Sequence, residues 1–194
     1  MTQSSPSSLP ASMTLREAQP QDSAQLLLLG QSLLSETDYY TRLPEERAIN
    51  AQGMAEIAAT YKERRGWHMI NIWHGNQAIA EGILVPGPLY RTAHIGILGI
   101  GVLRRHWGQR LGQILMADLE DRARKDSLER LEFTVLSHNR RARDFYKRLG
   151  YYEEGRRRRS VRYGPESSSA RIRYGDEIHM AKWIGPKDCI DPEC

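Results

Sequence analysis

The 194-residue sequence predicts an α/β protein built around a mixed β-sheet. Two observations predict this class. Segments of strand length, either apolar or alternating between apolar and polar residues, recur along the chain, and segments with helical periodicity lie between them. The elements follow the order β-α-α-β-β-β-α-β-α-β-β, and the sequence contains no internal repeat. A chain of this length can form one domain with a substantial core.

Each element is predicted by a local pattern. Asp22 is a typical N-cap for the first helix, and Pro44 fits the first turn of the second, where acidic residues follow it at the positive end of the helix dipole. Gly150 follows the last helical pattern at the C′ position. We expect a hairpin turn at 74–76 and a polar loop at 163–175. We expect strands at residues 14–18, 67–73, 77–85, 94–102, 131–135, 151–162 and 176–183, and helices at 20–34, 44–61, 111–125 and 139–149.

Composition indicates a globular protein with a mild excess of positive charge. The chain has 28 basic and 24 acidic residues and a net charge of +4, which suits an anionic ligand and does not by itself indicate nucleic acid. Cys189 and Cys194 are the two cysteines, so a disulfide framework is not expected, and a reducing, cytoplasmic location is. No apolar run approaches the roughly 18 residues of a membrane span, and no secretory signal is recognisable.

The chain divides into three expected parts. Residues 1–12 are rich in Ser and Pro and predict a disordered leader, with Met13 as an alternative start. Residues 13–184 form the expected domain, and residues 185–194 form a C-terminal tail.

The most informative stretch runs from residue 93 to residue 116. A glycine-bearing apolar strand ends near Val102, a basic loop containing Gly108 follows, and an amphipathic helix begins near Leu111. The first turn of a helix leaves backbone N–H groups unpaired, and the helix dipole favours negative charge there. Three arginines in the loop add positive charge beside these donors. The stretch therefore predicts a site for a phosphate or pyrophosphate.

Two common nucleotide-binding motifs do not fit this stretch. The Walker loop requires a Gly-Lys-Ser/Thr tripeptide, which the sequence lacks. The Rossmann fingerprint requires G-x-G-x-x-G at the turn from strand to helix. Gly99 and Gly101 lie inside the strand, and their spacing to Gly108 does not match.

The stretch instead resembles motif A of the GNAT acyltransferases, which binds the pyrophosphate of acetyl-CoA. Residues 107–112 read W-G-Q-R-L-G. Trp107 stands where Arg or Gln is usual, and Arg110 stands where Gly is usual, so the Arg110 side chain must point away from the phosphates or bind them as a cation. Residues 139–155 read N-x-x-A-x-x-x-Y-x-x-x-G-Y-x-x-E-G and resemble motif B of the same family. Residues 176–180 resemble the last strand of the branch that includes ribosomal-protein and small-amine acetyltransferases.

The resemblance covers residues 14–184 and implies a GNAT-type sheet, mostly antiparallel, with helices on both faces. It implies an N-acetyltransferase that transfers the acetyl group of acetyl-CoA to a primary amine by direct attack in a ternary complex, without a metal. The acceptor would be a small molecule or a protein amine. A homodimer is compatible with the resemblance, whereas a membrane or a nucleic acid is not an expected partner. Two alternatives stay open: a non-catalytic acyl-CoA-binding or RNA/ribosome-associated module on this fold, and a transferase for longer acyl groups.

The resemblance also assigns the residues of the donor site. Gly108 to Gln113 would hold the pyrophosphate through backbone N–H groups, and Ile100 and Val102 would pair their backbone with the pantetheine arm. Asn139 would bond to the cofactor arm, although Asn before a short helix is also a common N-cap. The implied cofactor-binding residues are Ile100, Val102, Trp107, Gly108, Gln109, Arg110, Leu111, Gly112, Gln113 and Asn139.

The resemblance also implies the catalytic residues, whose roles suit the chemistry of thioester aminolysis. Tyr146 would be the general acid, because a phenol with a pKa near ~10 is protonated at neutral pH and can donate to a thiolate; a core aromatic is the alternative. The strand that enters motif A carries no acidic residue that could serve as the base. Glu36 and Asp38 lie in the link that usually lines the acceptor pocket, and Glu36 is our candidate base. His94 and Glu81 are lesser candidates.

Arg156 to Arg159 form a run of four arginines on a predicted strand. Strand alternation would place two of them on each face. The favoured interpretation is a solvated edge strand that charge protects from pairing, and the alternative is a docking patch for an acidic acceptor or RNA.

Overall fold

A computed structural model describes residues 9–48, 50–163 and 173–186. These residues form one seven-stranded sheet of order β1-β2-β3-β4-β5-β7-β6. The strands are β1 (Met13–Glu17), β2 (His68–His74), β3 (Gln77–Pro86), β4 (Ile95–Val102), β5 (Arg130–Leu136), β6 (Tyr152–Tyr163) and β7 (Arg173–Trp183). The α-helices are α1 (Ser23–Ser35), α2 (Ala51–Glu63), α3 (Leu111–Lys125) and α4 (Arg140–Arg148). The predicted order of elements is confirmed.

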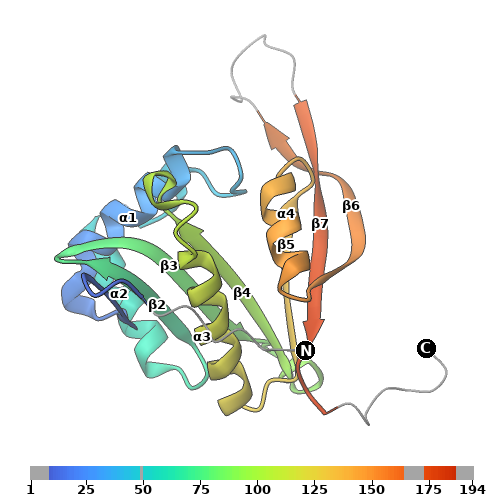
Figure 1. The fold of residues 1–194 in the computed structure, drawn as a ribbon, viewed down its shortest axis with the longest axis horizontal. Helices are drawn as coiled ribbons and strands as arrows, with labels where there is room; N and C mark the ends of the chain where they lie inside the picture. Colours follow the sequence, from blue (N-terminus) through green and yellow to red (C-terminus); the bar gives the residue numbers. More distant parts are fainter. Residues whose placement is uncertain (1–8, 49, 164–172, 187–194) are drawn as a thin grey trace.

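The sheet is antiparallel except between β4 and β5, which are parallel. These two strands pair only at Ile95–Ile97 with Arg130–Glu132. Beyond these pairs no further β4–β5 pairing occurs, and the strands, which meet near the bottom of the view in Figure 1, separate toward the top. The sheet therefore opens between its two halves, β1–β4 and β5–β7.

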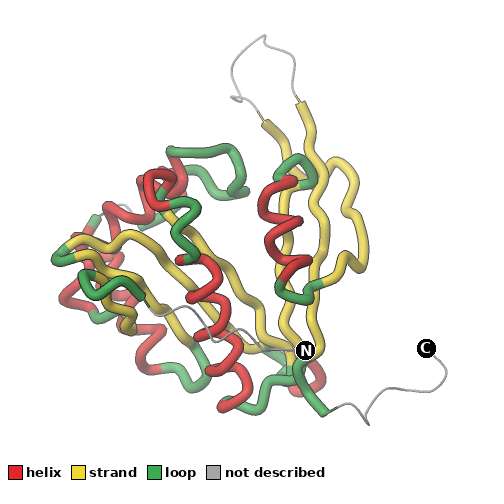
Figure 2. The backbone as a smooth tube through the Cα atoms, viewed as in Figure 1, coloured by secondary structure: helices red, strands yellow, loops and turns green. Residues whose placement is uncertain are grey.

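Helices cover both faces of the sheet, as predicted (Figure 2). A Cβ built on Gly101 of β4 would meet Leu33 and Tyr40, so α1 and the segment after it lie on that face. A Cβ built on Gly82 of β3 would meet Leu115 and Leu119 of α3, which covers the other face. The mixed, mostly antiparallel sheet with helices on both faces confirms the predicted fold class.

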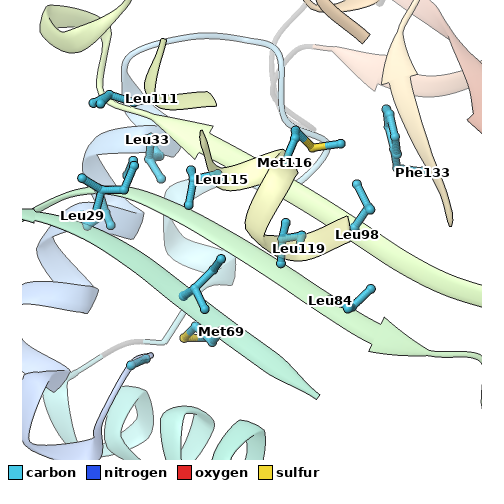
Figure 3. Close-up of a cluster of buried hydrophobic side chains, with 14 of the residues drawn as sticks. Leu29, Leu33, Met69, Leu84, Leu98, Leu111, Leu115, Met116, Leu119 and Phe133 are labelled. Atoms are coloured by element: carbon cyan, nitrogen blue, oxygen red, sulfur yellow. The ribbon is translucent and has the colours of Figure 1, made fainter. Parts of the chain in front are cut away.

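The core lies on both sides of β2, β3 and β4. The apolar stripe of α3 packs onto the sheet through Leu111, Leu115 and Leu119, all fully buried, beside Leu84 of β3 (Figure 3). Close-packed apolar contact of this kind positions the first turn of α3 firmly against the end of β4. No helix in the described part of the chain is long and apolar enough to cross a membrane.

The second helix begins later than predicted. Pro44–Glu46 form a separate 3-10 turn, η2, and α2 starts at Ala51 with the Asn50 side chain accepting from the Gly53 N–H at 2.9 Å. Between the two, Arg47 has an extended backbone. Its side chain passes over Gly30 of α1, and its guanidinium donates to the Glu81 carboxylate. This buried ion pair, with N···O 2.6 Å, explains why the helical pattern is interrupted.

Two further local predictions hold only in part. Asp22 occupies the predicted N-cap position of α1 but makes no capping bond, because its carboxylate accepts from Arg16 and from the Gln19 N–H. The arginine run lies on the exposed edge strand β6, as the favoured interpretation expected, but the predicted alternation between faces does not continue beyond Arg157. The β6–β7 register shifts between Arg157 and Val161, and Arg159 adopts a φ of 52° with its N–H bonded to Asp176, so the run is bulged and exposed throughout.

The ends of the expected domain are described only in part. Residues 9–12 of the predicted leader are described, and Leu9 packs partly against the core. Most of the leader, most of the C-terminal tail including both cysteines, and most of the loop predicted over 163–175 lie outside the described residues.

Candidate active site

A cavity of about 660 Å³ occupies the opening between β4 and β5. It extends from the first turn of α3, past the ends of both strands, to the segment after α1. Eleven of the twelve predicted site residues line it: Glu36, Ile100, Val102, Trp107, Gly108, Arg110, Leu111, Gly112, Gln113, Asn139 and Tyr146. Gln109 is the exception, and it is exposed on the outer side of the loop. Residues separated by more than a hundred positions thus converge on one space.

The backbone of β4 presents hydrogen-bonding groups to this cavity in alternation. The Leu103 N–H donates to Ile79 of β3 and the Ile95 carbonyl accepts from Gly87 after β3, whereas the His94 carbonyl accepts from Arg130 on the β5 side. Odd-numbered residues of β4 therefore bond to β3, and even-numbered ones face β5. Because β5 diverges, the N–H and C=O of Ile100 face the cavity, as the pantetheine assignment requires.

Trp107 fastens the loop after β4 onto the end of that strand. Its indole N–H donates to the Val102 carbonyl at 2.7 Å, so that carbonyl is occupied and Val102 offers its N–H to the cavity. The Arg141 guanidinium from α4 lies 4.4 Å from the centre of the indole ring. Trp107 therefore holds the loop against the end of β4 and packs against the Arg141 guanidinium. It does so at the position where the family motif usually has Arg or Gln.

The loop meets α3 through two residues in the left-handed region. Gly108 has a φ of 82°, and Arg110, the N-cap of α3, has a φ of 62°. This conformation explains why glycine is usual at the Arg110 position. The Leu111 and Gly112 N–H groups point out of the first turn without a backbone acceptor among the described residues. The arrangement is a helix N-terminus with free donors beside a cation, which suits a pyrophosphate.

Tyr146 is buried on the α4 side of the cavity. Its ring packs 4.3 Å from Phe133 and 5.1 Å from Phe145, and only 7% of its surface is exposed. Burial, with a smaller contribution from Tyr40, raises the pKa of Tyr146 well above its usual range. The hydroxyl makes no hydrogen bond to the described residues. Tyr146 is thus both a core aromatic and a protonated phenol on the cavity wall.

Tyr40, which the sequence analysis did not single out, faces the cavity from the opposite face of the sheet. Its hydroxyl would lie 2.7 Å from a Cβ built on Gly101, so it reaches the β4 backbone at the opening. Burial and the nearby carboxylate of Glu81 raise the pKa of Tyr40 to about 12. Only the close approach to Gly101, which no sequence pattern reports, reveals this residue.

The candidate bases lie in different environments. Glu36 lines the cavity, and its Oε2 accepts the Arg104 N–H at 2.6 Å, which ties the end of α1 to the loop after β4. Glu81 is paired with Arg47 and does not line the cavity. Asp38 is 72% exposed at the rim, 3.8 Å from His138. His94 lies where β4 and β5 meet, at the closed end. Among these candidates, Glu36 is therefore the one whose residue lines the cavity.

Residues at the start of α4 complete the wall. The Asn139 side chain accepts from the Ala142 N–H at 3.1 Å, so it is an N-cap, while its amide nitrogen makes no bond to the described residues. The loop after α1 reaches this turn, because the Tyr39 ring lies 5.5 Å from the His138 ring. Thr134 of β5 also lines the cavity and was not predicted. The described residues contain no cluster of three or more metal-ligating side chains.

Comparison with known proteins was made by sequence and by structure. The curated relative YdgE from Bacillus subtilis (strain 168), named an uncharacterized N-acetyltransferase, is 28% identical over 117 residues. The match covers 60% of this chain and 66% of YdgE, just under two thirds of its length.

Solved structures share the fold over nearly their whole length. A GNAT-family acetyltransferase from Streptococcus pneumoniae superposes with a TM-score of 0.79 at 23% identity, covering 89% of this chain and 99% of that one. The putative acetyltransferase yncA from Salmonella typhimurium, solved with acetyl-CoA, gives a TM-score of 0.74 at 17% identity, covering 93% and 99%. A profile of the family described as "Acetyltransferase (GNAT) family" matches residues 32–151. This segment is more than half of the chain, which therefore belongs to the GNAT acetyltransferase family.

Proposed function

We propose that this protein transfers the acetyl group of acetyl-CoA to a primary amine by direct attack within a ternary complex. The observation that carries the proposal is the opening between β4 and β5, which joins the free donors at the start of α3 to a buried phenol. A thioester placed in that opening has the pyrophosphate site at one end and the segment after α1 at the other. The cavity volume of about 660 Å³ suits a cosubstrate arm and a small acceptor group.

The donor would be held mostly by backbone groups. The pyrophosphate would accept from the N–H groups at the start of α3, with Arg110 and Arg141 adding positive charge. The pantetheine arm would lie along β4 and bond to Ile100 and to the Val102 N–H. Asn139 would offer its amide nitrogen to the same arm. A backbone N–H of β4 facing the opening, that of Ile100, would polarise the thioester carbonyl.

The chemical step requires proton transfers at the nitrogen and at the sulfur. Glu36 would take one proton of the acceptor ammonium, which frees the nitrogen lone pair for attack, and would pass it to solvent. The C–N bond forms, the C–S bond breaks, and the leaving sulfur takes the proton of Tyr146, whose raised pKa keeps the phenol protonated until a thiolate develops. The nitrogen, which is positively charged after attack, loses its second proton as the amide forms, and this proton restores the Tyr146 phenol. The described residues contain no cysteine that could carry an acyl group, which favours direct attack.

The test begins with binding. Acetyl-CoA at about a hundred times its Kd should stabilise the full chain by about 2.7 kcal/mol. CoA release is then followed over a panel of phenethylamine, spermidine and a tripeptide with a free α-amine. Tyr146→Phe should lower kcat by about a hundredfold and leave acetyl-CoA binding intact. Stabilisation without CoA release from any amine, and without any effect of Tyr146→Phe, would instead favour a non-catalytic acyl-CoA-binding module.

A further inference from the structure

A chain of polar contacts runs from the cavity wall to the protein surface and has no part in the chemistry above. The Thr134 hydroxyl of β5, which lines the cavity, donates to the Glu177 carboxylate of β7 at 2.9 Å. Glu177 is 6% exposed and forms an ion pair with Arg157 of β6 at 3.0 Å. A buried carboxylate is costly unless it is paired, so a carboxylate held directly behind a cavity-lining hydroxyl calls for an explanation.

Thr134 lies on the acceptor side of the opening. The register pairs Ile97 of β4 with Glu132 of β5, so these two side chains point to the same face of the sheet, and Thr134 follows Glu132 on that face because strand side chains alternate. Odd positions of β4 face α1 and Tyr40, as Gly101 does, whereas Tyr146 packs on Phe133 on the opposite face. Thr134 and Tyr146 therefore approach the opening from opposite faces of the sheet.

The bond to Glu177 fixes the polarity of the Thr134 hydroxyl. A hydroxyl has one proton and two acceptor lone pairs, and a carboxylate only accepts. Since the Thr134 proton is committed to Glu177, the hydroxyl offers only lone pairs to the cavity. Arg157 holds the far side of the carboxylate and limits its rotation.

We propose that Thr134, polarised by Glu177, binds and orients the N–H of the acceptor amine. The inference rests on the proposed function and deepens it. Glu36 on one wall would remove a proton from the ammonium, while the Thr134 oxygen on β5 would hold a second N–H and so aim the lone pair at the thioester. Thr134 would contact the substrate directly, whereas Glu177 and Arg157 are positioning residues.

The proposal defines the acceptor chemically. The acceptor must carry at least two N–H bonds on its cationic nitrogen, one for Glu36 and one for Thr134, so it is a primary or secondary ammonium. A quaternary ammonium of the same shape keeps the charge but has no N–H. A site that recognised charge alone would bind both equally, because Coulomb attraction does not depend on the presence of a donor.

The first test needs no turnover. Calorimetry in the presence of CoA would compare the panel amine with the greatest CoA release, or phenethylamine if none is released, with its N,N,N-trimethyl derivative. The wild type should bind the primary amine at least tenfold more tightly, because the trimethyl derivative loses the N–H bonds to both Glu36 and Thr134. Equal affinity for the two, or no binding of either, would overturn the proposal.

Variants then test whether Thr134 causes the preference for the primary amine over its trimethyl derivative. Thr134→Val keeps the shape and removes the hydroxyl, so it should lower the discrimination about tenfold, leaving the part due to Glu36, and raise the acceptor KM about tenfold, with acetyl-CoA KM and thermal stability unchanged. Thr134→Ser should restore both values. Glu177→Gln should also lower the discrimination, because its amide can donate to Thr134 and turn the hydroxyl proton toward the cavity. Thr60→Val is the matched control, since the Thr60 hydroxyl lies on α2 and donates to the Glu56 carbonyl.

The outcomes separate this inference from the proposed function. Unchanged acceptor KM and discrimination in Thr134→Val would overturn the role of Thr134 while leaving the acetyltransferase intact. Absence of CoA release in the wild type, with discrimination present and lowered about tenfold in Thr134→Val, would contradict the proposed reaction and still support the amine site. A drop in acetyl-CoA affinity equal to that of the amine would place Thr134 in the donor site and overturn the proposal.

Discussion

Arg110 places a cationic side chain at a backbone position that favours glycine. The N-cap of α3 is in the left-handed region, with a φ of 62° and a ψ of 8°, where a side chain costs roughly 1–2 kcal/mol. Glycine would avoid this cost but supply no charge. Arg110 therefore combines a cation at the proposed pyrophosphate site with local backbone strain, which is a common arrangement at functional positions.

The strain can be measured at this one residue. Arg110→Gly and Arg110→Ala both remove the guanidinium, but only glycine relaxes the backbone. After the greater chain entropy of glycine in the unfolded state is subtracted, Arg110→Gly should be more stable than Arg110→Ala by about 0.5–1 kcal/mol. Urea unfolding of the two variants gives this difference. Equal stability would show that the loop relaxes without glycine.

The sequence predicted the site residues that local motifs mark and missed those that long-range contact creates. Motif spacing was enough to place Tyr146 and Arg110 on one cavity. Tyr40 and Thr134 belong to no motif. Their roles depend on the close approach to Gly101 and on the bond to Glu177, which lies 43 positions away in the sequence. No local periodicity encodes contacts of this kind.

At the scale of elements, the site depends on where β4 stops pairing. One strand serves two partners: its odd residues bond to β3 along its length, while its even residues lose β5 after Ile97. Unpaired backbone groups within a protein need partners. A bound pantetheine arm would supply them at Ile100 and at the Val102 N–H.

Amide hydrogen exchange resolves this alternation. In the free protein the N–H groups of Ile100 and Val102, which lie beyond the last β4–β5 pair, should exchange faster than those of Gly99 and Gly101, because β3 protects the odd positions. Acetyl-CoA should slow exchange at the even positions and leave the odd ones nearly unchanged, so each neighbour is an internal control. Residue-resolved exchange by NMR measures this pattern. Equal slowing at all four positions would indicate general stiffening and argue against a backbone-bonded arm.

The elements that the sequence misplaced are those shaped by distant ion pairs. The pattern at Pro44 resembles a helix start, but Arg47 leaves the helix to reach Glu81 on β3. The arginine run resembles a regular strand, but Asp176 of β7 accepts both the Arg159 N–H and the Arg156 side chain and so stabilises a bulge. Strand and helix periodicities indicate which positions bury apolar side chains. They do not indicate which acidic residue a given arginine will contact in the folded chain.

At the scale of the whole molecule, polar contacts hold the two halves of the opened sheet in place. The buried Glu120 of α3 bonds to Lys182 of β7 at 2.8 Å and accepts from the Tyr151 hydroxyl, which ties the half bearing β4 to the half bearing β7. On the other face the Arg47–Glu81 pair anchors the segment between α1 and α2. The opening is therefore a fixed feature of the folded chain, and it holds the largely buried phenols of Tyr40 and Tyr146 on its walls.

The burial of these two phenols makes the free energy of unfolding depend on pH in the alkaline range. Burial raises the pKa of Tyr40 to about 12 and that of Tyr146 further, whereas both titrate near ~10 when unfolded. Above about pH 10 the unfolded chain has lost phenolic protons that the folded chain still binds, so the free energy of unfolding falls as pH rises. The contribution is complete below pH ~10 and is lost as pH approaches the folded pKa. Each such group changes the slope by up to about 1.4 kcal/mol per pH unit.

Tyr146→Phe should therefore make the alkaline decline in stability shallower by about 1 kcal/mol per pH unit between roughly pH 10 and 11.5. Urea unfolding across this range provides the slope for the variant and the wild type. Tyr90→Phe is the matched control, because the Tyr90 ring is 96% exposed and meets the same solvent before and after unfolding. If both variants keep the wild-type slope, the Tyr146 phenol is not desolvated. The opening would then admit water to Tyr146, and the acid proposed for thiolate protonation would lack the environment that its role requires.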